Sequence, residues 1–256
     1  MKNFLSIDFE SWAYPDLLEF RNLSSRERKK LDAGFVKESA EKILKILAKY
    51  DVKLTFFVLG QLYEWYPETI EKIAQAGHEL GFHTYSHDIL RSKDVLIKSL
   101  ELSKKFLQKF HPKGFRAPNI LMENEYFPIL KKYGFEYDSS AYGLRSTKKV
   151  VDGILEIPVS VYGPLPIGSG YFVGLLRERI GWFYQQLNKK NLPVVAFLHS
   201  WQIVKPQKTT FPSRAYLLTH PIYLPYQRDC LPIFEYLLAN FEFGKMENLL
   251  KVGKND

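Results

Sequence analysis

The sequence has one cysteine, Cys230, among its 256 residues, and only six histidines. A single cysteine excludes a disulfide within the chain and a metal site made of several thiolates. No apolar run approaches the roughly 20 residues that a membrane-spanning helix needs. The opening residues MKNFLSIDFE carry acidic residues too early for the apolar core of a secretory signal. We therefore expect the protein to be made in the cytoplasm and to remain there.

The sequence also lacks the patterns that accompany nucleic-acid binding. Its net charge is +8, but apart from RERKK at 26–30 the basic residues are dispersed. No zinc-finger spacing and no RNA-binding aromatic motif accompanies them, so a solvated basic surface explains the charge better than a nucleic-acid partner. With 46% hydrophobic and 15% aromatic residues, the chain can bury the core of a single domain spanning residues 1–256.

Predicted strands alternate with predicted helices along the chain. Apolar or β-branched runs predict strands at 4–9, 53–60, 78–83, 114–116, 135–138, 154–162, 192–200 and 241–243. The spacing of apolar residues predicts helices at 39–50, 66–77, 92–110, 124–133, 174–191 and 229–240. This alternation predicts an α/β fold with mostly parallel strands, of which a barrel is one form. Residues 11–35 and 201–228 do not follow the alternation, and loops of that length are often functional.

Several polar residues stand where the predicted strands end. They are Asp8, Glu10, His83, His87, Arg116, Asp138 and His199. The carboxyl ends of parallel strands share one edge in such folds, and active sites collect there. We therefore expect these side chains to face one mouth. Their convergence is more informative than any single motif.

The segment HTYSH at 83–87 places two histidines four residues apart. On one face of a helical turn, His83 and His87 would lie close enough to share a metal ion. Asp8 or Glu10 can supply an oxygen ligand, and two histidines with one carboxylate leave a position open for water, as in catalytic zinc sites. The alternative is a turn or a helix start whose histidines make ordinary hydrogen bonds. The convergent carboxylates favour the metal site.

Five segments together resemble the motifs of the NodB-like polysaccharide deacetylases, a family of carbohydrate esterases. HTYSH resembles the family's His-Ser/Thr-x-x-His metal motif, and SIDFE at 6–10 occupies the place of its first, acidic motif. FRAPN at 115–119 resembles its Arg-x-Pro motif, FLHSW at 197–201 resembles its Leu-x-His motif, and FEYDSS at 135–140 lies where a further aspartate is expected. The order and spacing agree from residue 4 to about residue 202. The resemblance implies a single distorted (β/α) barrel of seven strands.

The resemblance also implies a metal site and a general base. Glu10, His83 and His87 would bind one divalent metal ion, zinc. Asp8 would take a proton from the attacking water, and Arg116 would hold Asp8 in place through a charged hydrogen bond. A Lewis acid and a base are both useful here because an amide is a poor electrophile.

The same resemblance makes His199 the general acid and Asp138 a partner that tunes it. Two departures from the family pattern stand out. Phe9 separates the two carboxylates of SIDFE, whereas the family has adjacent aspartates, so the roles of Asp8 and Glu10 can be exchanged. Alternate residues of a strand share a face, so both side chains can still point inward. Asn119 follows Pro118 where an aromatic residue is frequent in the family.

The resemblance implies a metal-dependent hydrolase that removes an N-acyl group, acetyl, from an amino sugar. One alternative is hydrolysis of a non-sugar amide or imide bond, and another is a carbohydrate-binding barrel without turnover. Because no export signal is recognised, we expect the substrate to be a glycan precursor, soluble or lipid-linked at the inner membrane face. Residues 201–228 would then be a substrate lid, in which aromatic rings meet sugars and cations meet phosphate or an anionic bilayer. The residues concerned are Lys205, Lys208, Arg214, Arg228, Trp201, Phe211, Tyr216, Tyr223 and Tyr226.

Overall fold

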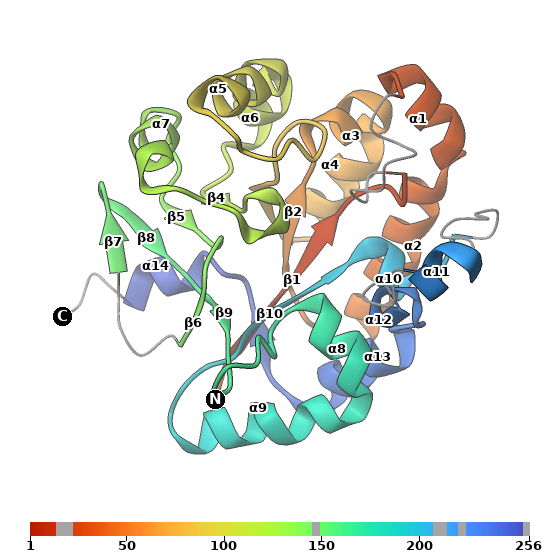
Figure 1. The fold of residues 1–256 in the computed structure, drawn as a ribbon, viewed down its shortest axis with the longest axis vertical. Helices are drawn as coiled ribbons and strands as arrows, with labels where there is room; N and C mark the ends of the chain where they lie inside the picture. Colours follow the sequence, from red (N-terminus) through yellow and green to blue (C-terminus); the bar gives the residue numbers. More distant parts are fainter. Residues whose placement is uncertain (14–22, 145–148, 207–213, 220–223, 253–256) are drawn as a thin grey trace.

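Most strands of the protein form one curled, mainly parallel sheet with helices around it (Figure 1). The computed structural model describes residues 1–13, 23–144, 149–206, 214–219 and 224–252. The sheet follows the order β10 (Val195–His199), β1 (Asn3–Phe9), β2 (Thr55–Val58), β3 (Glu79–Phe82), β4 (Gly114–Phe115), β5 (Tyr137–Asp138), β8 (Ile154–Glu156) and β7 (Lys149–Val151). The pairing is parallel from β10 to β8, whereas β7 is antiparallel to β8, and β11 (Phe243–Gly244) lies parallel to the start of β1.

The helices surround this sheet, as Figure 1 shows. They are α1 (Ser25–Asp32), α2 (Phe35–Lys49), α3 (Gly60–Trp65), α4 (Pro67–Gln75), α5 (Lys93–Leu102), α6 (Lys104–Phe110), α7 (Phe127–Lys132), α8 (Gly170–Leu176), α9 (Ile180–Lys189), α10 (Ser200–Ile203), α11 (Arg214–Thr219), α12 (Leu224–Gln227), α13 (Leu231–Asn240) and α14 (Asn248–Val252). Short 3₁₀ turns cover Pro118–Ile120, Asn124–Tyr126 and Arg177–Arg179. No helix in the described ranges is long and apolar enough to cross a membrane.

The two ends of the sheet meet through a short segment rather than through a ladder between β8 and β10. Residues Val159–Ser160 form β9, which pairs with β6 (Tyr142–Gly143) in a separate sheet. The backbone N–H of Phe197 in β10 donates to Gly168 O at 2.8 Å. A Cβ on Gly168 would lie 2.3 Å from Val195 O, so only glycine permits this approach. The result is the distorted barrel, and its parallel run from β10 to β8 matches the predicted seven strands.

Alternation along the strands separates the barrel interior from the helix-facing side. In β1, Leu5, Ile7 and Phe9 join the large buried cluster that includes the helices. Phe4 belongs instead to a smaller cluster with residues such as Phe57 of β2, inside the barrel. Asp8 has the same parity as Phe4, so the strand period directs it inward. The interior therefore holds apolar rings at one end and ionisable groups at the other.

Some predicted elements differ from the structure for local reasons. The predicted helix 92–110 divides into α5 and α6 at Ser103, against which Gly60 of α3 packs so closely that no Cβ would fit. The predicted strand 154–162 divides into β8 and β9 around Pro158, which has no N–H to donate. Residues 11–35, read as a loop, contain α1, whose N-cap Ser24 and Glu27 form a capping box.

Candidate metal and catalytic site

The carboxyl ends of β1, β3 and β10 and the turn after β4 bring the predicted polar residues together. In the β1–β10 ladder Asp8 pairs directly with His199. Glu10 follows two positions after Asp8 on the same side of the chain, and His83 follows the end of β3. The structure therefore brings these side chains together at one mouth, as the parallel sheet predicts.

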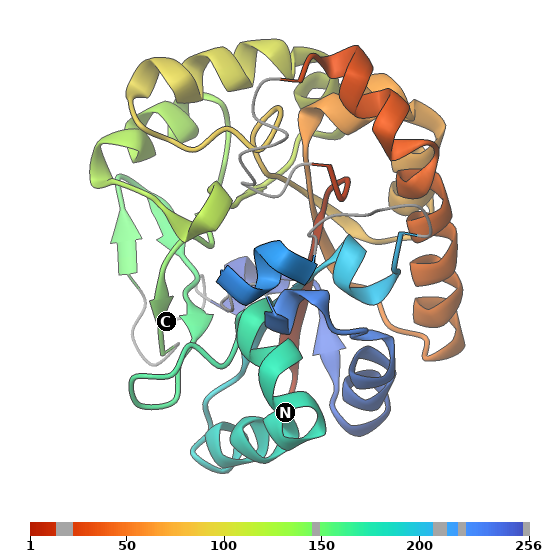
Figure 2. The ribbon, with the colours of Figure 1, turned by 45° about the vertical axis from the view of Figure 1, so that its right-hand side comes forward.

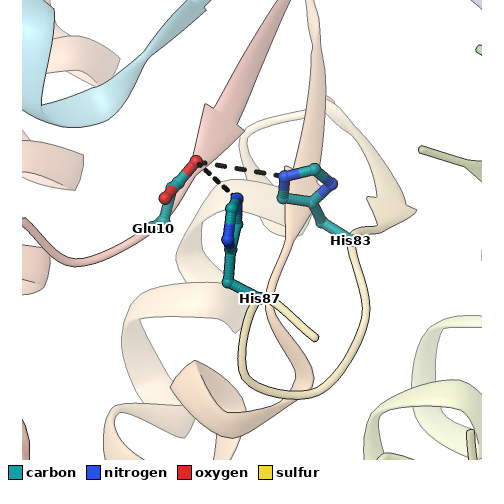
Figure 3. A group of neighbouring side chains, drawn as sticks. All are labelled: Glu10, His83 and His87. Atoms are coloured by element: carbon teal, nitrogen blue, oxygen red, sulfur yellow. Dashed lines mark ion pairs between the residues drawn. The ribbon is translucent and has the colours of Figure 1, made fainter. Parts of the chain in front are cut away.

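Glu10, His83 and His87 form a compact group of three potential metal ligands (Figure 3). Glu10 Oε1 lies 3.9 Å from His83 Nε2 and 4.0 Å from His87 Nε2. Their ligand atoms all lie within 4.8 Å of one another, and no other group of three or more such side chains occurs in the described part of the chain. Glu10 and His83 are almost completely buried, with side-chain exposures of 1% and 2%. Two imidazole nitrogens and one carboxylate oxygen suit zinc, and the set leaves a position for water.

The prediction that His83 and His87 share a helical face is wrong. Residues 83–87 form a turn after β3, in which Thr84 and His87 have positive φ angles of 65° and 63°. A β-branched residue such as Thr84 rarely adopts this conformation, so the surrounding structure must impose it. Ser99 Oγ accepts from Tyr85 N at 2.6 Å, and Gly60 N donates to Thr84 O at 2.9 Å. These contacts hold the turn that directs His87 toward Glu10.

The ring of His83 has a defined orientation and tautomer. Its Nδ1 lies 2.7 Å from the backbone carbonyl of Arg116. A carbonyl only accepts, so Nδ1 carries the proton and the Nε2 lone pair faces Glu10. Burial is the main cause that lowers the pKa of His83, to about 4, so the ring is neutral at pH 7. A neutral imidazole with its second nitrogen bound to a carbonyl is the usual form of a metal-ligating histidine.

Asp8 is paired with Arg116 rather than with the two histidines of the turn. Arg116 Nη1 lies 2.6 Å from Asp8 Oδ1, and both side chains are buried. Burial opposes ionisation of Asp8, but the positive charge of Arg116, with smaller contributions from His83 and His199, outweighs it and lowers the pKa of Asp8. Asp8 is therefore an ionised carboxylate at neutral pH.

Arg116 is itself fixed on every side. Its Nη1 donates to Ser6 Oγ at 2.7 Å, and its Nε and Nη2 donate to Ser139 O and Oγ at 3.1 and 2.9 Å. Its guanidinium lies over the rings of Phe57 and Phe197, 4.2 and 4.9 Å from their centroids. A planar cation between aromatic faces with its donors satisfied has little freedom to move.

His199 approaches the same carboxylate from β10. Its Nε2 lies 3.7 Å from Glu10 Oε1, and its ring stacks on Trp201 at 4.6 Å between centroids. Tyr226 meets the ring edge-on at 5.7 Å. Burial is the main cause that lowers the pKa of His199.

Asp138 does not contact His199. The Asp138 carboxylate accepts from Ser140 Oγ at 2.6 Å and from Ser140 N at 2.8 Å, and Ser140 Oγ accepts from Ala117 N at 2.7 Å. The side-chain partner of the His199 ring is Gln202, at 2.7 Å. Asp138 therefore holds the turn after Arg116, which corrects its expected role as the partner of His199. Burial raises the pKa of Asp138 to about 7.

Asn119 occupies a backbone position that explains its residue type. It has φ 56° and ψ 17° in the 3₁₀ turn after Arg116. Asparagine tolerates this left-handed conformation better than most residues. Its side chain is exposed, so the aromatic wall that the family resemblance implies is absent at this position.

Some residues of the predicted lid lie near His199, and others lie outside the described residues. Trp201 and Tyr226 contact His199, while Lys205 Nζ donates to Tyr226 O at 3.2 Å and Arg228 is exposed. The segment includes α10 to α12, and α12 packs against α8 beside the end of β10 (Figure 2). Lys208, Phe211 and Tyr223 lie outside the described residues, as do the side chains of Arg214 and Tyr216.

The comparisons with known proteins agree with this geometry. Residues 30–137 match the family model described as polysaccharide deacetylase. A Mycobacterium smegmatis protein described as a polysaccharide deacetylase shares the fold, with a TM-score of 0.60 and 19% identity over 98% of this chain and 91% of that chain. Over residues 30–137 the chain is therefore similar to the polysaccharide deacetylase family, and the solved structure shows that the fold is shared along most of the chain. The matched segment includes His83, His87 and Arg116, whereas Asp8, Glu10 and His199 join them only in the folded chain.

Two curated members of the family are similar over part of their length. The peptidoglycan deacetylase of Helicobacter pylori is 38% identical over 105 residues, which are 39% of this chain and 36% of that protein. The peptidoglycan-N-acetylglucosamine deacetylase of Bacillus cereus is 37% identical over 101 residues, covering 37% of this chain and 36% of that protein. The chain therefore matches little more than a third of each relative.

Sequence reasoning missed several polar residues that support the site. Ser6 and Ser139 bind Arg116, Ser140 links Asp138 to the following turn, and Gln202 binds His199. The serines carry no distinctive pattern because a single buried hydroxyl resembles any other small residue. Gln202 had one available signal, its position three residues after a strand-ending histidine, at the start of a helix.

Proposed function

We propose that the protein is a metal-dependent hydrolase that removes an N-acyl group, acetyl, from an amino sugar of a glycan or glycan precursor. The observation that carries the proposal is one mouth with three metal-ligand candidates, an Arg-paired aspartate and a histidine. The names of the two curated relatives, a peptidoglycan deacetylase and a peptidoglycan-N-acetylglucosamine deacetylase, support this substrate class.

Glu10, His83 and His87 are the proposed metal ligands, and their donor types fit zinc. A divalent ion bound there supplies a Lewis acid that polarises the acyl carbonyl and makes water more acidic. The geometry supports Glu10 rather than Asp8 as the carboxylate ligand, because Glu10 Oε1 faces the Nε2 atoms of both histidines. Asp8 instead faces Arg116.

Asp8 is the proposed general base. Its carboxylate is ionised, and Arg116 fixes one oxygen, Oδ1, at 2.6 Å. Asp8 receives the proton of the attacking water while Arg116 holds the carboxylate in place. The same cation that orients Asp8 also lowers its pKa, so the carboxylate is a weaker base.

His199 is the proposed general acid. Its Nε2 faces Glu10 and the proposed metal site, on the side opposite to its contact with Gln202. As general acid His199 acts in its imidazolium form, and the proton at Nε2 is then directed toward the reacting groups. Transfer of that proton to the amine nitrogen lets the C–N bond break without expelling an amide anion.

Acetate release from purified protein tests the proposal. N-acetylglucosamine oligomers and lipid-linked amino sugars serve as substrates, with a linear amide and a cyclic imide as the non-sugar alternatives. We expect the protein to release acetate from an amino sugar. Chelation should abolish this activity and zinc should restore it, and His199→Ala should lower the rate by about 10²–10⁴-fold. Turnover of only the non-sugar compounds would replace the substrate class, and binding of oligomers without turnover would favour the carbohydrate-binding alternative. The cytoplasmic location and peripheral contact with the inner membrane face remain predictions, which cell fractionation tests.

A further inference from the structure

We propose that Gln202 is a positioning residue that fixes the tautomer and the orientation of His199. This inference rests on the proposed function, because His199 is the general acid there. The residue lies in α10, immediately after β10, and it is completely buried. Its side chain makes contacts to the backbone and to the imidazole that leave one arrangement of protons.

The orientation of the Gln202 amide follows from two backbone contacts. Nε2 donates to Gly170 O at 3.0 Å, and Oε1 accepts from His199 N at 3.1 Å. A carbonyl oxygen cannot donate and a backbone N–H cannot accept, so exchanging the two ends of the amide would lose both hydrogen bonds. Oε1 is therefore the atom that lies 2.7 Å from His199 Nδ1.

This orientation dictates where the imidazole carries its proton. Oε1 is only an acceptor, so Nδ1 must be the donor of the 2.7 Å contact. In the neutral ring the Nε2 lone pair then faces Glu10 and the mouth. The other neutral tautomer would bring the Nδ1 lone pair against Oε1, where two acceptors repel. Any proton that His199 gains or gives up during turnover is thus confined to Nε2.

Gly170 and the backbone of Cys230 keep the amide in place. A Cβ on Gly170 would lie 2.5 Å from Gln202 Oε1 and 3.3 Å from His199 Nδ1, so a side chain there would displace the contact. Cys230 N donates to Gln202 O at 2.9 Å, which ties α10 to the start of α13. The stacked ring of Trp201 then limits rotation of the imidazole about the Cβ–Cγ bond of His199.

Nitrogen-15 NMR of the histidine side chains in the zinc-loaded protein tests the inference without any substrate. The spectrum distinguishes Nδ1–H from Nε2–H rings, and a His199→Gln variant assigns the signals of His199. We expect His199 in the wild-type protein to carry its proton on Nδ1. Gln202→Met removes the acceptor and should release the ring to the Nε2–H form. Gly170→Ala should act in the same direction by displacing the amide.

Gln202→Glu is the matched control. Both Gln202→Met and Gln202→Glu lose the donor to Gly170 O, but only the glutamate keeps an acceptor for Nδ1. A positioning role predicts that Gln202→Glu keeps the Nδ1–H ring and a larger share of kcat, while Gln202→Met loses roughly 10-fold or more of kcat with little change in KM. Equal losses of kcat in the two variants would show that Gln202 only stabilises the local structure. An Nε2–H ring in the wild type overturns the inference whatever the activity, whereas absent turnover with an Nδ1–H ring would overturn only the proposed function.

Discussion

Arg116 and Asp8 form a buried ion pair, with Nη1 2.6 Å from Oδ1, although 108 positions separate them in the sequence. Neither side chain has the solvent that would otherwise stabilise its charge. The pair is balanced by the contacts of Arg116 with Ser6 and Ser139. Its removal should therefore affect the fold as well as the proposed chemistry.

Replacing Arg116 with methionine should leave the Asp8 carboxylate buried and unpaired. We expect Arg116→Met to lower the free energy of unfolding by about 3–5 kcal/mol, measured by urea unfolding at pH 7. Adding Asp8→Asn should recover part of this loss, because the stranded charge is then removed. Lys42→Met is the control. Lys42 pairs with Glu38 on the exposed face of α2, so its loss should lower the free energy of unfolding by only about 0.5 kcal/mol. A similar small loss in Arg116→Met would contradict the predicted cost of the unpaired charge.

Metal content should separate Glu10 from Asp8. We expect the wild-type protein to carry one divalent ion, zinc under the proposed function. Glu10→Ala, His83→Ala and His87→Ala should lose it, because each removes a proposed ligand. Asp8→Asn should keep the metal and lose turnover, since Arg116 rather than the metal is its partner. Elemental analysis of the purified variants measures this, with His111→Asn as a control for a histidine outside the site. Loss of metal in Asp8→Asn but not in Glu10→Ala would show that the two carboxylates have exchanged roles.

The positions of these carboxylates were predictable from the sequence, and the reason is geometric. Asp8 and Glu10 lie two residues apart, so a strand directs both inward, and β10 ends in His199 beside them. The conformation of 83–87 was not predictable, because its positive φ angles at Thr84 and His87 depend on Ser99 and Gly60 from other elements. Spacing of four residues suggested a helix, yet a turn produced the same convergence.

The partner of His199 was unpredictable for a different reason. Family resemblance placed an aspartate in the interval around Asp138, and the structure directs that side chain to Ser140. The contact with Gln202 requires β10 to end at His199 and α10 to begin at once, with a glycine from α8 leaving room. No local pattern predicts this meeting of three segments.

His78 should make the protein less stable in mild acid. Its Nδ1 accepts from Leu54 N at 3.1 Å, and burial lowers its pKa from 6.5 to about 4. The unfolded chain therefore binds a proton between these values that the folded chain does not, so stability falls as pH decreases below about 6.5. We expect a loss of about 2 kcal/mol from this group between pH 7 and pH 5, measured by urea unfolding.

One variant isolates the contribution of His78. His78→Gln keeps an acceptor but cannot titrate, so its unfolding free energy should change less between pH 7 and pH 5. The assignment to His78 fails if His78→Gln keeps the full dependence as well.

The basic residues of 201–228 should bind a phosphate group of the substrate if this segment acts as a lid. Trp201 and Tyr226 already contact His199, and Arg228 is exposed two residues beyond Tyr226. Lys205 is different, because it is partly buried and donates to Tyr226 O. We expect Lys208→Gln, Arg214→Gln and Arg228→Gln together to raise KM for a diphosphate-linked amino sugar more than for a neutral oligosaccharide. Steady-state kinetics on the two substrates measure the difference, with metal content as the check on the site.

Lys205→Met provides the contrast, because its structural contact predicts the opposite pattern. Loss of the hydrogen bond to Tyr226 O should loosen the aromatic ring beside His199 and lower kcat equally for both substrates. The triple variant should leave kcat on the neutral oligosaccharide near the wild-type value, since none of its three residues has a described contact with His199. Equal KM changes on the two substrates would show that these charges do not recognise an anionic carrier, and the segment would then act on the site only through Trp201 and Tyr226.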